Sequence, residues 1–255
     1  MAGTVIAAQL YTLREFLKTP EDIARTLERV KEIGYGAVQL SGLGPIDPEE
    51  LAKRLQENQL VAAATHVSFE RLQQEFQQVV DEHKLWGCKH VAIGSMPGKY
   101  RNGAEGYKLF AQEATVVGRK LAEEGLTFSY HNHSFELEKF DGRLGLDIIL
   151  EESDPEVVLA EIDTYWIQHG GGDPAAWVKK VSGRMRIVHL KDMAISEGRQ
   201  VMAEVGEGNL NWSAILQACK EAGVCWYAVE QDQCQRDPFE SLAISLKNLK
   251  AMGLE

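Results

Sequence analysis

The segment YHNHSFE brings together two imidazoles and a carboxylate, those of His131, His133 and Glu136. Imidazole nitrogens are common ligands of transition metals, and a free imidazole has a pKa of about 6.5, so it also exchanges protons near neutral pH. The carboxylate can bind the same metal, serve as a base, or fix the orientation of an imidazole. The segment therefore predicts a metal site, a proton-transfer site, or both.

Three further residues of these types follow apolar runs later in the chain, namely Asp163 in EIDTY, His189 in IVHLK and Glu230 in YAVEQ. Each has a structural alternative. Asp163 can form a turn, and His189 can be a hydrogen-bonded core histidine. Glu230 is harder to explain in this way, because a buried carboxylate without a partner costs several kcal/mol. A cation beside Glu230 is the simplest explanation.

These residues belong to a chain in which short apolar runs alternate with amphipathic segments. The runs expected to form strands are residues 4–11, 37–41, 61–67, 90–95, 126–132, 157–165, 186–192 and 226–232. The clearest helical segments between them are residues 20–34, 47–59, 69–87 and 107–125. Eight strands, each followed by a helix, in about 250 residues predict an α/β fold, a single (β/α)8 TIM barrel domain over residues 1–255. A doubly wound open sheet is the alternative, but no glycine-rich phosphate motif follows any strand.

In such a barrel, functional side chains gather at the C-terminal ends of the strands. The polar residues expected at these ends are Gln9, Gln39, His66, Ser95, His131, Asp163, His189 and Glu230. The last four follow consecutive strands, and neighbouring strands lie about 4.8 Å apart, so their side chains can face one point. Two imidazoles and two carboxylates suit Mn²⁺, Zn²⁺, Co²⁺ or Fe²⁺ better than Mg²⁺.

The net charge of −11 argues against nucleic acid as a partner, because binding the phosphate backbone requires a basic face. The longest apolar runs are far shorter than the roughly 20 residues that span a bilayer, so we expect no membrane insertion and a cytoplasmic location. The four cysteines are widely spaced and include no C-x-x-C pair. Their spacing therefore suggests neither a zinc ribbon nor a disulfide framework.

In order along the chain, the motifs QLYTLRE, YHNHSFE, EIDTYW, VHLKD, GEG and VEQD resemble those of the xylose isomerase-like barrel proteins. This family contains sugar isomerases and epimerases, inosose dehydratases and, more distantly, endonuclease IV. The resemblance implies a divalent metal, commonly Mn²⁺, bound by Glu, Asp, His and Glu on strands five to eight. Asp163, His189 and Glu230 match the last three ligands. His131 stands where the family has its first glutamate, so either His131 or Glu136 is the ligand from strand five.

The resemblance also implies that the enzyme removes a proton next to a carbonyl, forming an enediolate that the metal stabilises. In the family's epimerases two metal-bound glutamates exchange this proton on opposite faces of the substrate. With His131 in place of one of them, we assign proton transfer to His133, with Glu136 as a reserve base or as an orienter of an imidazole, and to Glu230. Reprotonation would give isomerisation or epimerisation, and loss of a β-hydroxyl would give dehydration.

Six residues at or just beyond strand ends are candidates for binding a carbohydrate substrate, although each can equally be a packing or solvated residue: Tyr11, Arg14, His66, Tyr100, Trp166 and Lys191. Trp166 replaces the histidine usual in the family. Three classes of function remain open, namely a metal-dependent isomerase, epimerase or dehydratase of keto-sugars, a nuclease resembling endonuclease IV, and a sugar-binding barrel without catalysis. The sequence leaves open the substrate, its phosphorylation, the metal and whether the chain forms a homo-oligomer.

Overall fold

The computed structural model describes residues 5–254, in which eight parallel strands close into a barrel. In chain order, which is also their order around the barrel, they are β1 (Val5–Gln9), β2 (Ala37–Leu40), β3 (Val61–His66), β4 (His90–Ile93), β5 (Thr127–His131), β8 (Val158–Asp163), β9 (Met185–Leu190) and β12 (Trp226–Val229). Pairing of β12 with β1 completes the ring. The prediction of a (β/α)8 barrel is confirmed, and the open sheet is excluded.

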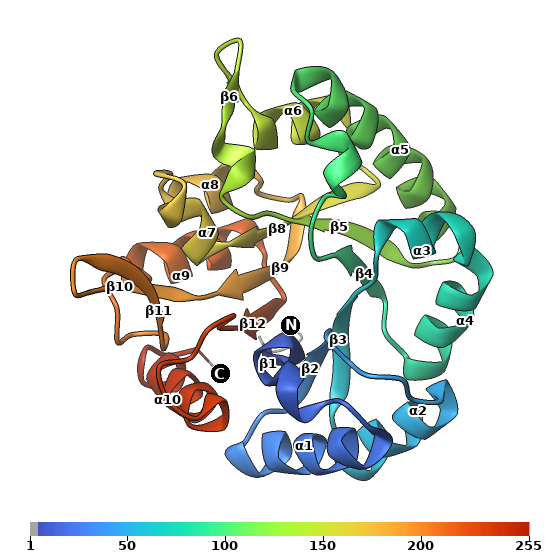
Figure 1. Cartoon of the computed structure of the whole chain (residues 1–255), viewed down its shortest axis with the longest axis vertical. Coiled ribbons are helices and arrows are strands. Elements are labelled where there is room, and N and C mark those ends of the chain that lie inside the picture. The colour runs from blue at the N-terminus through green and yellow to red at the C-terminus, as the bar shows by residue number, and fades with distance from the viewer. Residues whose placement is uncertain (1–4, 255) are drawn as a thin grey trace.

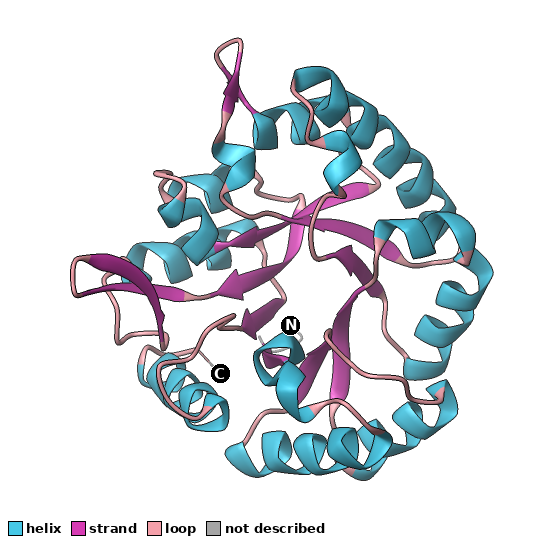
Figure 2. Ribbon diagram, in the orientation of Figure 1, coloured by secondary structure: helices cyan, strands magenta, loops and turns pink. Residues whose placement is uncertain are grey.

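Helices form an outer layer around these strands (Figure 2). They are α1 (Pro20–Ile33), α2 (Pro48–Glu57), α3 (Phe69–Gln74), α4 (Phe76–Trp86), α5 (Ala104–Glu123), α6 (Gly145–Glu152), α7 (Thr164–His169), α8 (Pro174–Lys180), α9 (Trp212–Ala222) and α10 (Pro238–Ala251). None of the helices within residues 5–254 combines the length and apolar character that crossing a bilayer requires.

The helix predicted for residues 69–87 is divided into α3 and α4. Glu75 leaves the helical conformation, with φ −122° and ψ 33°. Arg71 stabilises the break, because its Nε donates to Glu75 Oε2 over 2.8 Å while its Nη2 pairs with Glu82 in α4. The ion pairs of Arg71 thus connect the two helices, an arrangement that apolar spacing alone does not reveal.

Two hairpins that the sequence analysis did not predict project from the barrel rim (Figure 1). One joins β6 (Lys139–Phe140) to β7 (Arg143–Leu144), and the other joins β10 (Asp192–Ser196) to β11 (Arg199–Ala203). Both turn on two residues with positive φ, Asp141-Gly142 and Glu197-Gly198. Three short 3-10 helices also follow strands at this end: η1 (Leu10–Phe16), η2 (Gly98–Tyr100) and η3 (Phe135–Leu137).

Strand alternation explains why polar side chains gather inside the C-terminal end of the barrel. Two groups of buried apolar residues, separate from the main core, pack against Trp226 and fill the lower interior. One group is Ala7, Ala37 and Ala63, and the other is Ala64, Ile187 and Ala228. Because side chains two positions apart share a face of a strand, the next inward residue lies one layer higher. In four strands an apolar residue of the lower layer is followed two positions later by a polar residue of the upper layer: Ala7 by Gln9, Ala37 by Gln39, Ile187 by His189, and Ala228 by Glu230. An apolar layer therefore supports a polar one.

Asp192 anchors the loop between β11 and α9 to the end of β9. Its buried carboxylate accepts five hydrogen bonds, from the backbone N–H groups of Met193, Gly206, Gly208 and Leu210 and from the indole N–H of Trp212. A Cβ at Gly208 would lie 2.4 Å from Asp192 Oδ1, and Gly206 has a φ of +88°. The two glycines of the GEG motif are therefore required by this close approach and by the backbone conformation.

We expect Asp192→Ala to lower the free energy of unfolding by about 3 kcal/mol or more, because several buried donors lose their acceptor together. Urea denaturation would measure this change. Asp47→Ala is the matched control, since Asp47 caps α2 with two hydrogen bonds at an exposed position and its loss should cost about 1 kcal/mol. Equal losses for the two variants would contradict an anchoring role for Asp192.

Candidate metal centre

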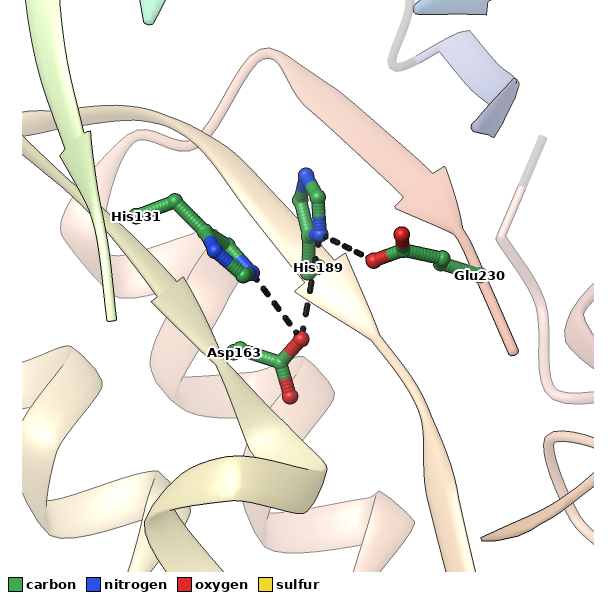
Figure 3. Close-up of side chains that lie close together, drawn as sticks. All are labelled: His131, Asp163, His189 and Glu230. Carbon is green, nitrogen blue, oxygen red and sulfur yellow. Dashed lines mark hydrogen bonds and ion pairs between the residues drawn. The ribbon is translucent and has the colours of Figure 1, made fainter. Parts of the chain in front are cut away.

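Four side chains predicted as metal ligands meet at the C-terminal mouth of the barrel. They come from the consecutive strands β5, β8, β9 and β12 or the residue directly after: His131, Asp163, His189 and Glu230. Each contributes one donor atom, and these atoms lie within 4.8 Å of one another. Figure 3 shows Asp163 between the two imidazoles, and Glu230 on the far side of His189. The four side chains are buried.

The orientation of His131 is fixed by the barrel wall. Its Nδ1 lies 3.0 Å from the carbonyl oxygen of Gly94, directly after β4. A carbonyl only accepts, so Nδ1 carries the proton in this contact. In the neutral imidazole the lone pair is then on Nε2, which lies 3.1 Å from Asp163 Oδ2. His131 therefore directs a ligand atom toward the centre of the cluster.

His189 is held in the same way by residues deeper in the barrel. Its Nε2 lies 2.7 Å from Gln39 Oε1 and 2.8 Å from Glu161 Oε1, so this nitrogen is a donor. Nδ1 faces the cluster, 2.8 Å from Glu230 Oε2 and 3.8 Å from Asp163 Oδ2. Two nitrogens and two carboxylate oxygens that converge from fixed side chains fit a divalent transition metal.

Without a metal, His189 is a cation. Burial alone would lower its pKa, but Glu161 and Glu230 on its two sides outweigh this effect and raise the pKa to about 10. His189 then donates from both ring nitrogens, and a metal would replace the proton on Nδ1.

Glu161 is a buried carboxylate beside the cluster that the sequence analysis missed. It is fully buried, and its Oε1 accepts hydrogen bonds from Gln39 Nε2 at 2.9 Å and from His66 at 2.7 Å, besides the contact with His189. Burial opposes its charge, but His189 and His66 hold its pKa well below the usual range. Its position two residues before Asp163 places both on one face of β8, and this alternation could have revealed it.

Lys191, predicted to contact substrate, lies inside the cluster of charges. Its buried ammonium is 3.0 Å from Asp163 Oδ2, 2.7 Å from Glu230 Oε2 and 2.8 Å from Asp232 Oδ2. Three carboxylates thus use its three N–H donors. Thr164 fixes the backbone here, because its hydroxyl accepts from the N–H of Lys191 and donates to the Lys191 carbonyl.

His133 and Trp166 lie beside the cluster with unpaired polar atoms. Their rings are 5.2 Å apart, and the His133 ring lies 5.0 Å from that of His131. Neither His133 Nδ1 nor Trp166 Nε1 has a hydrogen-bond partner within the described residues, although both atoms are buried. Burial, followed by the charges of His131 and Lys191, lowers the pKa of His133 to about 3. His133 is therefore neutral at pH 7, with a much lower pKa than a free imidazole.

Glu136 lies behind the strand rather than among the ligands. It accepts a hydrogen bond from the Tyr130 hydroxyl and another, 2.9 Å long, from the backbone N–H of His133. Glu136 thus orients the backbone of His133, and within residues 5–254 it makes no hydrogen bond to an imidazole. Among the described residues, the group of four converging donors contains His131 and not Glu136.

The other predicted substrate contacts are divided between the mouth and the core. Tyr11 is exposed, and Arg14 covers its ring and donates to the carbonyl of Asp232 over 2.8 Å. His66 stacks on His189 at 5.3 Å and lines two cavities of about 390 and 420 Å³. Tyr100 instead packs in the core, and its hydroxyl donates to Glu113 of α5.

A barrel with metal-ligand side chains on four consecutive strand ends defines a class of TIM-barrel proteins. Residues 27–252 match the family described as xylose isomerase-like TIM barrel, and the chain belongs to this family. Inosose dehydratase of Clostridium beijerinckii is 25% identical over 258 residues, which cover 85% of each chain. Inosose dehydratase of Clostridium botulinum is 26% identical and covers 81% of this chain and 82% of its own length.

Solved structures share the whole fold. A sugar phosphate isomerase/epimerase from Parabacteroides distasonis superposes with a TM-score of 0.82 at 24% identity, over 98% of this chain and 95% of its own. An L-ribulose 3-epimerase gives a TM-score of 0.75 at 16% identity, over 98% and 94% of the two chains. A probable 3-DHS dehydratase from Bacillus anthracis gives 0.73 at 13% identity, over 96% and 98%. At these identities the similarity establishes the fold.

We expect Glu136→Gln to change how stability depends on pH. Burial raises the pKa of Glu136 to about 7 from 4.5, despite the hydrogen bonds from Tyr130 and His133. A carboxyl group with a raised pKa contributes stability below pH 4.5 that is lost as the pH rises to 7. Relative to wild type, the variant should therefore gain about 3 kcal/mol in free energy of unfolding across this window.

Urea denaturation at intervals between pH 4.5 and 7 would measure the difference. Glu138→Gln, at an exposed position of the same turn, is the control and should follow the wild type. Parallel pH profiles for Glu136→Gln and wild type would contradict the raised pKa.

Proposed function

We propose that this protein is a divalent-metal-dependent carbohydrate isomerase or epimerase that removes the proton next to the carbonyl of a keto-sugar or related polyol. The observation that carries the proposal is the convergence of His131, Asp163, His189 and Glu230 within 4.8 Å at the barrel mouth. A bound metal would act there as a Lewis acid for the negative charge that develops on the substrate oxygens. Mn²⁺ is our first candidate, followed by Zn²⁺, Co²⁺ and Fe²⁺.

His133 is the residue we assign to proton transfer. Its ring adjoins that of His131, and its Nδ1 has no hydrogen-bond partner within residues 5–254. The lowered pKa leaves it neutral at pH 7, with a lone pair free for a proton, and makes it a weaker base than a free imidazole. A base contributes about 10²- to 10⁴-fold to a rate when its pKa lies near the working pH. Glu230 is the second candidate, but hydrogen bonds from His189 and Lys191 engage the oxygen that it directs into the cluster.

Dehydration of a keto-sugar or inosose is the second candidate reaction. Two observations favour it, the relatives named inosose dehydratase and the presence of His131 instead of a second glutamate. Of the two ligands from β5 and β12, His131 and Glu230, only Glu230 is a carboxylate, and this removes the symmetry on which two-sided proton exchange depends. The same proton abstraction at His133 would begin either reaction, and loss of a β-hydroxyl would distinguish dehydration.

The surroundings of the cluster suit a small polar substrate. The indole N–H of Trp166 is buried without a partner, so a substrate oxygen can accept from it. The cavity of about 420 Å³ beside His66 is lined in part by Ser95 and Arg101. Its volume is within the range typical of small-molecule sites. Trp166 beside the cluster thus offers a hydrogen-bond donor, and the cavity that His66 lines offers room for a sugar.

We expect about one divalent ion per chain after incubation with Mn²⁺ and removal of excess metal. Asp163→Ala and Glu230→Ala should each lose most of this ion, because each removes an anionic ligand. Metal analysis of the purified protein would measure the stoichiometry. Asp147→Ala, which removes a carboxylate from an exposed pair with Lys180, is the control and should retain the metal. Retention of the full ion in both site variants would refute the metal centre.

His133→Ala should keep the metal but lose most exchange of the substrate α-proton, whereas His131→Ala should weaken metal binding itself. The reason is positional, since of these two histidines it is His131 that directs a ring nitrogen at Asp163. Deuterium incorporation from D₂O into a panel of keto-sugars and inososes, followed by NMR, would measure exchange without knowledge of the product. The reverse pattern would exchange the two roles, and full exchange in His133→Ala would remove it from the mechanism.

A further inference from the structure

The ammonium of Lys191 lies where a cation is needed between the two carboxylate ligands. It contacts Asp163 Oδ2 at 3.0 Å and Glu230 Oε2 at 2.7 Å. These are the same oxygen atoms that face His131 and His189 across the cluster. A metal bound by the four residues would draw on these two oxygens. The ammonium and the metal therefore compete for the same negative charge.

This competition is strong because the side chains are buried. Lys191 and Asp163 have no exposed side-chain surface, and Glu230 has 4%. Repulsion between like charges is weakly screened in such surroundings, so an ammonium held by both ligands opposes the entry of a divalent ion. In the metal-free chain the same ammonium compensates two buried carboxylates that would otherwise repel each other.

Asp232 offers the ammonium a contact outside the group of four ligands. Its Oδ2 lies 2.8 Å from Lys191 Nζ, and it is outside the group of four ligands. The Asp232 side chain is 24% exposed, so this contact is at the solvent side of the cluster. Arg14 holds the backbone of Asp232 in place through its carbonyl oxygen.

We propose that Lys191 is a built-in counter-cation, which takes the place of the metal between Asp163 and Glu230 in the metal-free protein. When a metal binds, the ammonium withdraws from these two ligands and keeps its contact with Asp232. The proposal rests on the metal centre of the proposed function. It assigns Lys191 and Asp232 as positioning residues that set metal affinity in opposite directions. The metal-free barrel stays intact because the ammonium replaces the ion, and metal affinity is lower than the four ligands alone would give.

Mn²⁺ binding by the full chain, followed by electron paramagnetic resonance, tests the competition. Lys191→Met keeps the length of the side chain without its charge and should raise Mn²⁺ affinity by about tenfold or more. In EDTA the same variant should melt several degrees below wild type, because two carboxylates lose their partner, and Mn²⁺ should restore the loss. Lys84→Met, which breaks an exposed pair with Glu124, is the control for the change in net charge and should alter neither property.

A double-mutant cycle tests the role of the contact with Asp232. Asp232→Asn should weaken Mn²⁺ binding in the wild-type background, because the ammonium loses the contact that it keeps when a metal binds. In the Lys191→Met background it should have little effect. An equal loss in both backgrounds would show a general effect of charge and overturn this role. If Lys191→Met fails to fold, Lys191→Gln serves in the same cycle, since its amide still donates to one carboxylate.

Equal Mn²⁺ affinity of wild type and Lys191→Met, with binding present in both, would overturn the counter-cation while leaving the proposed function intact. Absence of Mn²⁺ binding from every variant would instead refute the metal centre and, with it, the competition. In that case the melting temperatures in EDTA still test the ammonium as a structural cation, and an unchanged melting temperature for Lys191→Met would refute that role too.

Discussion

The contacts of His189 with Glu161 on one side and Glu230 on the other are the interaction on which the rest of the site depends. Nε2 lies 2.8 Å from Glu161 Oε1, and Nδ1 lies 2.8 Å from Glu230 Oε2. One imidazole thus connects a buried lower carboxylate to the ligands at the mouth. Because a carboxylate on each side fixes the ring, Nδ1 can face only the cluster. The orientation of the four candidate ligands therefore depends on Glu161, which lies outside that group of four.

Closure of the barrel is what allows this arrangement. Gln39 in β2 reaches both Glu161 in β8 and His189 in β9, strands that are not its neighbours in the sheet. His66 at the end of β3 also crosses to Glu161. In an open sheet these side chains would point away on separate strands. The interior of a closed barrel makes them contact one another, and the layer of small residues around Trp226 closes the space beneath.

The cluster offsets most of its negative charge with cations from within the chain. Asp163, Glu230 and Glu161 are buried carboxylates, and the cations that face them are His189 and Lys191. Burying such groups without partners would cost several kcal/mol each, so the site has to be satisfied with or without an ion. His133 has no such role, because its Nδ1 has no hydrogen-bond partner within residues 5–254. The histidine that we propose for proton transfer thus takes no part in the ion pairs of the cluster.

The sequence by itself determined the alternation of strands and helices, and hence the barrel, because apolar periodicity is a local property of the chain. It also determined His131, Asp163, His189 and Glu230 as the candidate ligands, since each stands at the end of a strand and strand ends converge in this fold. It did not reveal that Tyr100 packs in the core, that Glu136 supports the backbone of His133, or that the ammonium of Lys191 lies among the ligands. Those outcomes were decided by the tertiary structure. Some partners of these side chains come from strands that are distant in the sequence, and others come from turns whose path the apolar pattern does not predict.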